Sequence, residues 1–231
     1  MAVHPKLRHS FDLTIPEARA LQEKLHSRVR EAELPHRLRR VAGADVSYDR
    51  GSPVLFAAVV VLDPATFEVI ESVGVEARAR FPYVPGYLSF REIPPLLEAF
   101  AKLSERPDLI VCDGQGRAHP RRFGLASHLG VTLDLPTIGC AKSRLVGEHR
   151  EPGPRRGASA PLRHEGEVIG TVLRTQAGVK PVYVSVGHRV TLAAARRWVL
   201  ALAPRHRLPE PVRAAHAEVN RLRRESCARP A

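Results

Sequence analysis

The chain has 231 residues, of which 44% are apolar, and its 36 Lys and Arg residues outnumber 24 Asp and Glu residues to give a net charge of +12. This length suffices for a substantial core, and we expect residues 1–231 to form a single domain. No apolar run approaches the roughly 18 residues of a membrane span, so we expect no membrane partner. Residues 1–11 lack the apolar block of a secretory signal, and three cysteines without paired spacing suit a reduced, cytoplasmic protein.

Positive charge of this size indicates a polyanionic partner, and nucleic acid is the first candidate. Arginine supplies most of the surplus. A basic protein encoded by GC-rich DNA would have a similar composition, so the charge alone leaves the partner open.

Apolar periodicity and turn signals predict a mixed α/β fold. The first helix is expected from Thr14 to about Glu33, because Thr14 and Glu17 have capping-box spacing and Pro16 lies in the first turn. Strands are expected at 41–48, 55–62, 67–77, 109–112, 135–141, 168–174 and 182–186, and further helices at 93–105, 123–129, 191–203 and from about 210. Short links favour an antiparallel meander of the first three strands, and the later strand–helix alternation favours parallel strands flanked by helices. Residues 143–166, rich in Arg, Pro and Gly, are predicted to be a basic, flexible excursion.

A short apolar strand at Leu109–Cys112 ends in a carboxylate, Asp113, which Gly114 and Gly116 follow at once. A run this apolar is typical of a strand buried on both faces of a sheet. The glycines let the backbone of the following loop come close to a ligand. A plain Asp-Gly turn that ends the strand is the alternative.

Asp45 is the one charged residue in the first predicted strand. A charge there needs a partner or a cation, and in such a sheet the first strand can lie beside the strand that ends at Asp113. We expect no lysine or arginine beside either carboxylate, so the pair would repel and favour a shared divalent ion. Oxygen ligands suit Mg²⁺ or Mn²⁺ better than zinc. The alternative puts Asp45 on the surface of an edge strand.

Glu92 has two interpretations. Its spacing from Ser89 matches a capping box. Pro94 and Pro95, however, fit a helix only within its first turn. The helix should therefore begin no earlier than about Glu92, which leaves that carboxylate free to face the site.

Two basic residues complete the candidate site. His216 lies on the apolar stripe of the last helix with Val212 and Val219, so it points inward, either as a hydrogen-bonded core residue or toward the carboxylates. Lys142 follows the strand 135–141 and can steady a phosphate.

The loop 81–91 combines prolines with aromatic side chains, among them Tyr83 and Tyr87. A rigid aromatic loop beside a basic groove is typical of proteins that separate bases and stack in the gap. The alternative is a loop whose aromatic rings fold back into the core.

The order of five motifs resembles endonuclease V, a family that nicks DNA beside deaminated adenine. The motifs are VAGADV at 41–46, PYVPGYLSFRE at 82–92, DGQGRAHPRRFGLASH at 113–128, PTIGCAK at 136–142 and GHRV at 187–190. The resemblance covers about residues 15–225. It implies a ribonuclease H-like fold with a Mg²⁺-dependent carboxylate centre, in which Mn²⁺ is expected to substitute.

The resemblance also implies roles for single residues. Asp45 and Asp113 match metal ligands, and Glu92 matches a third catalytic carboxylate that also binds metal. Lys142 matches a lysine near the scissile phosphate, and His216 a C-terminal histidine near the metal. The remaining positions resemble the wedge that fills the space of an everted base and the pocket that takes hypoxanthine: Tyr83, Pro85, Gly86, Leu88, Gly114, His119 and Leu145.

The implied reaction belongs to DNA repair: hydrolysis of the second phosphodiester bond 3′ of the lesion, leaving 3′-hydroxyl and 5′-phosphate ends. DNA with deaminated bases is the expected partner, and we expect a monomer. One alternative is a ribonuclease acting on inosine in single-stranded RNA. Another is a non-catalytic binder of distorted DNA, which clustered carboxylates disfavour because phosphate is an anion. Arg117 and Ser143 depart from residues common in the family, and the C-terminal histidine is not universal there.

Overall fold

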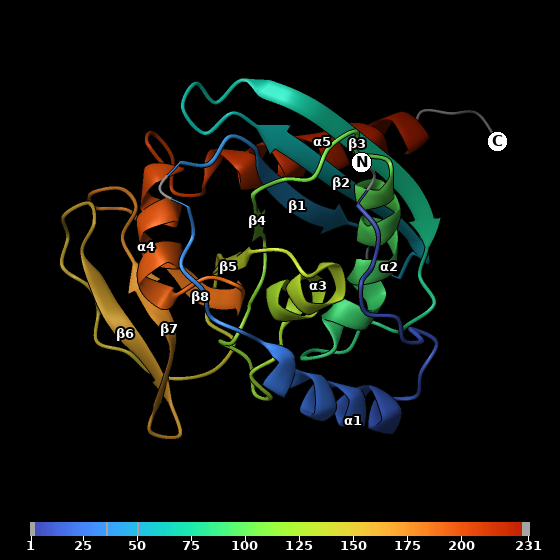
Figure 1. Cartoon of the computed structure of the whole chain (residues 1–231), viewed down its shortest axis with the longest axis horizontal. Helices are drawn as coiled ribbons and strands as arrows, with labels where there is room; N and C mark the ends of the chain where they lie inside the picture. The colour runs from blue at the N-terminus through green and yellow to red at the C-terminus, as the bar shows by residue number, and fades with distance from the viewer. Residues whose placement is uncertain (1–2, 36, 50, 228–231) are drawn as a thin grey trace.

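The computed structural model describes residues 3–35, 37–49 and 51–227, and within them the chain forms an eight-stranded sheet flanked by helices (Figure 1). The strands are β1 (Val41–Ser47), β2 (Val54–Leu62), β3 (Val69–Arg78), β4 (Leu109–Cys112), β5 (Thr137–Ala141), β6 (Ser159–His164), β7 (Glu167–Leu173) and β8 (Val182–His188). The helices are α1 (Ile15–Leu25), the 3₁₀ turn η1 (His26–Arg28), α2 (Leu88–Ala101), α3 (Leu125–Leu133), α4 (Leu192–Ala201) and α5 (Glu210–Cys227).

The sheet is mixed, as predicted. Its strand order is β3-β2-β1-β4-β5-β8-β7-β6. β4 pairs in parallel with β1 on one side and with β5 on the other, and the remaining neighbours are antiparallel. The first three strands therefore form the expected meander, and β4 and β5 continue it as parallel strands.

The middle of this sheet is buried on both faces. Ile110 and Cys112 face a core formed with α2 and α3, whereas Leu109 and Val111 face a core shared with α4 and the start of α5. Successive side chains of a strand point to opposite faces, so an unbroken apolar run is what such a strand requires. β1 lies between β2 and β4, which excludes Asp45 as a residue of an edge strand.

The first helix begins where the sequence predicts, with its capping box, and ends earlier. α1 stops at Leu25 rather than near Glu33. Beyond it, Arg30 is attached to the end of β8: its N–H donates to Nδ1 of His188 at 3.3 Å and its carbonyl accepts the N–H of Arg189 at 2.6 Å. These long-range hydrogen bonds hold the backbone at Arg30 against the end of β8, so the helix does not continue to Glu33.

The helix α2 begins at Leu88, so the prediction that it starts no earlier than Glu92 is wrong. Pro94 and Pro95 lie inside the helix, a position that costs roughly 3 kcal/mol per proline in a helix interior. Packing offsets that loss, because the inner face of the helix is buried in the core around Phe100. Tertiary burial here outweighs local preference.

Part of the segment predicted as a flexible excursion, 143–166, forms a strand. β6 pairs antiparallel with β7 at one edge of the sheet. Its Ala160 and Leu162 are buried, and Pro161 and Arg163 are exposed. An edge strand tolerates a proline because one row of its backbone groups needs no ladder partner. The predicted strands at 168–174 and 182–186 are confirmed as β7 and β8.

The two C-terminal helices begin where predicted. The hydroxyl of Thr191 accepts the N–H of Ala194 at 3.2 Å at the start of α4, and α5 begins at Glu210. α5 packs across β1 and β2 (Figure 1). No helix in the described part of the chain is long and apolar enough to cross a membrane.

Gly43 in β1 lets α5 lie directly on the sheet. A Cβ atom at this position would lie 1.8 Å from the carbonyl oxygen of Pro211.

We expect Gly43→Ala to push α5 away and to lower the free energy of unfolding by about 3 kcal/mol, as severe overpacking does, and urea unfolding measures this. Gly153→Ala is the control: its Cβ would meet the Cβ of Ala158 at 3.7 Å, an ordinary contact, and should change stability by less than about 0.5 kcal/mol. Equal effects of the two changes would contradict the close approach of α5.

Candidate active site

β1 and β4 bring two carboxylates together. Ala44 and Cys112 are the last residues paired in their parallel register, so Asp45 and Asp113 follow side by side. A carboxylate oxygen of each aspartate and a ring nitrogen of His216 all lie within 4.8 Å of one another. The two aspartates are therefore close enough to share a metal ion.

His216 reaches this pair from α5. The buried neighbours Ala215 and Val219 hold that helix on β1 and β2. Nδ1 of His216 donates a hydrogen bond to Oδ2 of Asp45 at 2.8 Å, while 50% of its side chain stays exposed. This exposure excludes a core histidine and leaves the ring open to the site.

Lys142 lies against Asp113, so the expectation that no cation accompanies either carboxylate is wrong. Nζ of Lys142 is 2.5 Å from Oδ2 of Asp113. The contact is one between neighbouring parallel strands: Cys112 of β4 is level with Gly139 of β5, so Asp113 lies one residue and Lys142 three residues beyond that pair, within reach of a long lysine side chain. The charge of Lys142 therefore compensates Asp113, whereas Asp45 accepts a hydrogen bond from His216.

Glu92 adds a third acidic group beside this pair. The hydroxyl of Tyr48, a residue that the sequence analysis did not single out, donates to its Oε1 at 3.3 Å. Burial and the charge of Asp45 raise the pKa of Glu92 to about 8. Burial and the charge of Asp113 likewise raise the pKa of Asp45. Glu92 itself stands outside the group of ligand atoms within 4.8 Å.

The donor set fits a hard divalent ion. The two carboxylates supply the oxygen ligands that Mg²⁺ and Mn²⁺ prefer, whereas the imidazole of His216 is a ligand more typical of transition metals. The raised pKa values of Asp45 and Glu92 reflect crowded negative charge, which a bound cation would relieve. The Cys112 thiol nearby is fully buried and burial raises its pKa, so it offers no thiolate for zinc.

A cavity of about 390 Å³ opens beside the carboxylates. All seven residues predicted to bind DNA or the lesion line it: Tyr83, Pro85, Gly86, Leu88, Gly114, His119 and Leu145. Glu92, Asp113 and Lys142 line it as well, so the cavity and the acidic group share a wall. Tyr83 is 59% exposed, which excludes the alternative that its ring folds back into the core.

Gln22 also lines the cavity, and the sequence analysis missed it. Its side chain, on α1, is fully buried, and its amide donates to the carbonyl oxygens of Gly86 at 3.2 Å and Phe123 at 3.3 Å. A signal was available. A glutamine between Ala18 and Leu25 on the apolar face of a helix is a buried polar group, which needs partners.

A family model of Endonuclease V matches residues 23–217. The chain belongs to the Endonuclease V family. It is 53% identical over 212 residues to Endonuclease V of Roseiflexus sp. (strain RS-1), covering 90% of this chain and 95% of the relative. The crystal structure of Endonuclease V from Streptomyces avermitilis matches with a TM-score of 0.90 and 48% identity over 99% of this chain and 100% of that chain. The crystal structure of Ciona intestinalis Endonuclease V, in complex with a 24mer DNA containing an inosine followed by a ribo-adenosine, matches with a TM-score of 0.79 and 26% identity over 91% and 98%.

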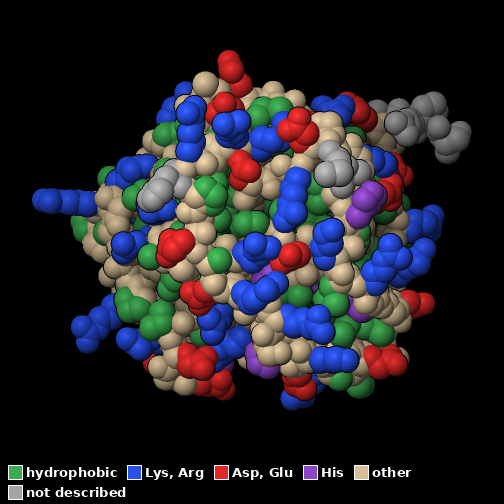
Figure 2. Space-filling model, viewed as in Figure 1, with side chains coloured by type: hydrophobic (Ala, Val, Ile, Leu, Met, Phe, Trp, Pro, Cys, Tyr) green, Lys and Arg blue, Asp and Glu red, His purple; other side chains and the backbone are tan. Residues whose placement is uncertain are grey.

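Membership of the Endonuclease V family makes the chain a nuclease, so both the predicted family and the predicted enzyme class are confirmed. Basic side chains are spread over the face seen in Figure 2 and are interspersed with acidic ones. On this face the basic side chains do not gather into one confined patch. The net charge of +12 favours nucleic acid without fixing where it binds.

His119 is held in the cavity wall as a neutral ring. It is 3% exposed, and its Nε2 lies 2.9 Å from the carbonyl oxygen of Gly86 while its Nδ1 lies 3.2 Å from the backbone nitrogen of Arg121. A carbonyl only accepts and a backbone N–H only donates, so the ring proton is on Nε2. Burial and the charge of Arg121 lower the pKa of His119 to about 4.

Protonation of His119 should therefore destabilise the fold in acid. Its pKa in the folded state lies below the ordinary 6.5, so its stabilising contribution is complete above that pH and is lost as the pH falls toward 4, amounting to at most about 3 kcal/mol. Urea unfolding at about pH 7 and about pH 4.5 measures the loss, which should be larger in the wild type than in His119→Gln. The other histidines titrate in both proteins and cancel from the difference. Equal losses would contradict the neutral ring.

Proposed function

We propose that this protein is a metal-dependent endonuclease of DNA repair that recognises deaminated adenine, hypoxanthine, in DNA and hydrolyses the second phosphodiester bond on its 3′ side. The products carry 3′-hydroxyl and 5′-phosphate ends, and the lesion stays in the strand. One observation carries the proposal: Asp113 both belongs to the acidic group and lines the cavity. A base in the cavity is then adjacent to the groups that act on the backbone. The inosine-containing DNA in the Ciona complex supports the choice of ligand.

Asp45 and Asp113 would hold a Mg²⁺ ion, with Glu92 as a further carboxylate, His216 close by and Mn²⁺ as a substitute. When bound, such an ion lowers the pKa of a water molecule and offsets the charge that develops on the phosphate. His216 orients the Asp45 carboxylate through its Nδ1–H, and the hydroxyl of Tyr48 orients Glu92.

Lys142 is assigned to the scissile phosphate. Its side chain is 40% exposed, and its ammonium group is bonded to Asp113. A phosphate oxygen attracts the same cation through a charge-assisted hydrogen bond. The lysine can therefore neutralise charge on the phosphate next to the carboxylates.

Backbone donors in the cavity favour a purine with an acceptor at position 6. Among the described residues, the N–H groups of Gly86 and Leu88 have no hydrogen-bond partner within the protein. Leu88 is the first residue of α2, so its N–H lies at the positive end of the helix dipole. Hypoxanthine carries an oxygen at position 6, where adenine carries an amino group. Unpaired N–H donors therefore select hypoxanthine.

Tyr83 and Pro85 would form the wedge that fills the gap left by the everted base. The exposed ring of Tyr83 packs edge-on against Tyr48 with centroids 6.2 Å apart. This contact holds the Tyr83 ring in place and leaves it exposed. Everting a base costs a few kcal/mol, and less when the base is mispaired. A preformed wedge offsets part of that cost by stacking in place of the lost base.

Inosine in single-stranded RNA is a second candidate substrate. The ribo-adenosine that follows the inosine in the Ciona complex favours it. Rates on DNA and RNA strands of matched sequence distinguish the two substrates.

Labelled duplexes with and without one hypoxanthine test the function in the presence of Mg²⁺. We expect a nick at the second bond 3′ of the lesion, in the hypoxanthine strand alone. Asp113→Asn and Glu92→Gln should lower the rate by about 1,000-fold while binding in EDTA persists, because each removes a carboxyl group that a bound cation would keep ionised. Glu98→Gln changes an exposed ion pair with Lys102 on the same helix as Glu92 and should keep full activity. Equal cutting of both duplexes would refute the substrate, and cutting in EDTA would refute the metal.

A second experiment addresses the wedge. Tyr83→Ala should lower the rate on hypoxanthine in duplex DNA by about tenfold, because a base–aromatic stack contributes roughly 1–3 kcal/mol. The same variant should cut a single-stranded hypoxanthine substrate nearly as fast as the wild type, since no paired base has to be displaced. Parallel losses on both substrates would remove the wedge role from Tyr83.

A further inference from the structure

The carbonyl oxygen of Gly86 is saturated with hydrogen bonds in the wall of the cavity. It accepts from Nε2 of His119 at 2.9 Å, from Nη2 of Arg121 at 2.7 Å and from Nε2 of Gln22 at 3.2 Å. A carbonyl oxygen has two lone pairs, so three donors leave it no capacity for a ligand. Gly86 has a φ of +81°, and this turn carries its carbonyl toward the three donors.

Arg121 and Gln22 form a closed pair around this carbonyl. Nε of Arg121 donates to Oε1 of Gln22 at 2.6 Å, and its guanidinium lies over the ring of Tyr87, 4.2 Å from the centroid. Gln22 is fully buried. The amide of Gln22 is thereby bonded at both its oxygen and its nitrogen, and two hydrogen bonds and a ring contact fix the orientation of Arg121.

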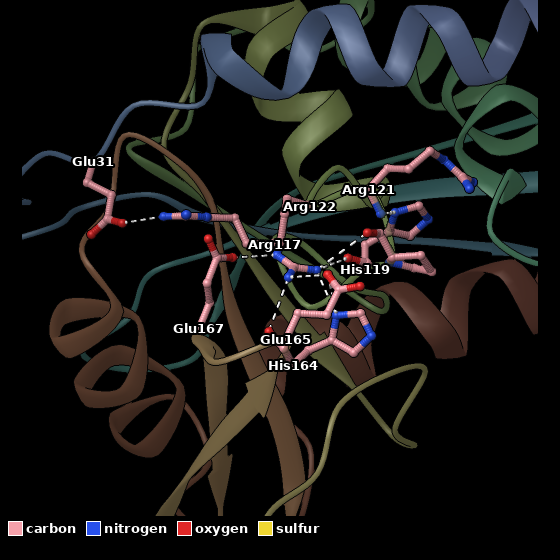
Figure 3. Close-up of polar contacts among 9 residues, drawn as sticks. Glu31, Arg117, His119, Arg121, Arg122, His164, Glu165 and Glu167 are labelled. Carbon is pink, nitrogen blue, oxygen red and sulfur yellow. Dashed lines mark hydrogen bonds and ion pairs between the residues drawn. The ribbon is translucent and has the colours of Figure 1, made fainter.

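The next residue, Arg122, holds the same loop from the other side (Figure 3). It donates to Glu167 at 2.9 Å and to Glu165 at 3.2 Å in the β6–β7 turn, and its side chain is 14% exposed. Its guanidinium also contacts His164 in the same turn. These contacts hold the loop independently of Arg121, and Arg121 is the member of the arginine pair that bonds two residues lining the cavity, Gly86 and Gln22.

Because the Gly86 carbonyl has no free lone pair, it affects how the cavity distinguishes hypoxanthine from adenine. Adenine carries an amino donor at position 6, and a carbonyl with a free lone pair would reward it with a hydrogen bond. Hypoxanthine carries an oxygen there and gains nothing from a carbonyl. The wall then offers a base free N–H donors but no free lone pair on this carbonyl. The amino group of adenine therefore finds no acceptor there.

We propose that Arg121 and Gln22 are specificity-determining positioning residues, which occupy the Gly86 carbonyl so that the cavity rejects adenine. This inference rests on the proposed function, because it presumes that the cavity receives the everted base. It deepens that function by assigning the rejection of the undamaged base to two residues that touch no part of the acidic group.

Equilibrium binding in EDTA tests the inference without requiring catalysis. The duplexes carry hypoxanthine, adenine or unsubstituted purine opposite an abasic site, so that none of the three bases has a pairing partner to lose. The proteins are the wild type, Arg121→Met, the double variant Gln22→Met with Arg121→Met, and Arg117→Met. The last is the matched control, since Arg117 lies on the same loop but bonds the exposed Glu31. Melting temperatures establish that each variant folds.

We expect the double variant to bind the adenine duplex about tenfold more tightly than the wild type does, with the unsubstituted purine duplex unchanged. Arg121→Met leaves one donor for each lone pair of the carbonyl, so it should bind the three duplexes as the wild type does. Gln22→Leu with Arg121→Leu removes the same two donors and keeps the test available if the first double variant does not fold. Arg117→Met should behave as the wild type.

Two results would overturn the inference. One is a hypoxanthine-to-adenine preference in the double variant within twofold of the wild type. The other is a preference lowered only through weaker hypoxanthine binding, which is what a generally loosened loop would produce. A wild-type protein with no preference for hypoxanthine would instead refute the proposed function, and the inference with it.

Discussion

The parallel pairing of β1 with β4 is the constraint on which the rest of the site depends. Its register sets Asp45 beside Asp113 in the middle of the sheet, where neither aspartate can turn away as a residue of an edge strand could. Burial and mutual repulsion raise the pKa of Asp45, so the arrangement needs positive charge nearby. Lys142, directly after β5, supplies it to Asp113, and α5 brings His216 to donate a hydrogen bond to Asp45.

The protein combines an acidic centre with a net charge of +12, so the binding of nucleic acid and its reaction depend on different charges. The net positive charge attracts a nucleic-acid backbone to the protein. At Asp45 and Asp113 the same backbone is repelled unless a cation lies between phosphate and carboxylate. Under the proposed function, a strand can therefore bind widely but reacts only where the carboxylates and a bound metal face it.

Local sequence signals predict an element correctly where the local preference of its residues and their burial favour the same structure. The β4 strand and the starts of α4 and α5 were predicted, and the place of Asp45 beside Asp113 followed from strand order. The start of α2 and the strand β6 were missed, because burial outweighs Pro94 in the helix and an edge strand tolerates Pro161.

The candidate site divides in the same way. The cavity residues came from the resemblance to a family rather than from periodicity, and Gln22 was missed because it lies outside every motif. The contact between Lys142 and Asp113 was in principle predictable, because both residues follow parallel neighbouring strands. It was overlooked because one lysine carries little information in so basic a chain.

The loop after β4 links the cavity to the acidic group because it packs flat against two strands. A Cβ at Gly116 would lie 2.1 Å from the carbonyl oxygen of Val186 in β8, and one at Gly139 in β5 would lie 2.4 Å from the nitrogen of Gly116. With the loop seated in this way, Asp113 at its start and His119 farther along keep a constant spacing. Under the proposed function, the base in the cavity then determines which phosphate faces the carboxylates. The distance between the lesion and the cut is in that case set by the packing of this loop on the sheet, and no moving lid is needed to set it.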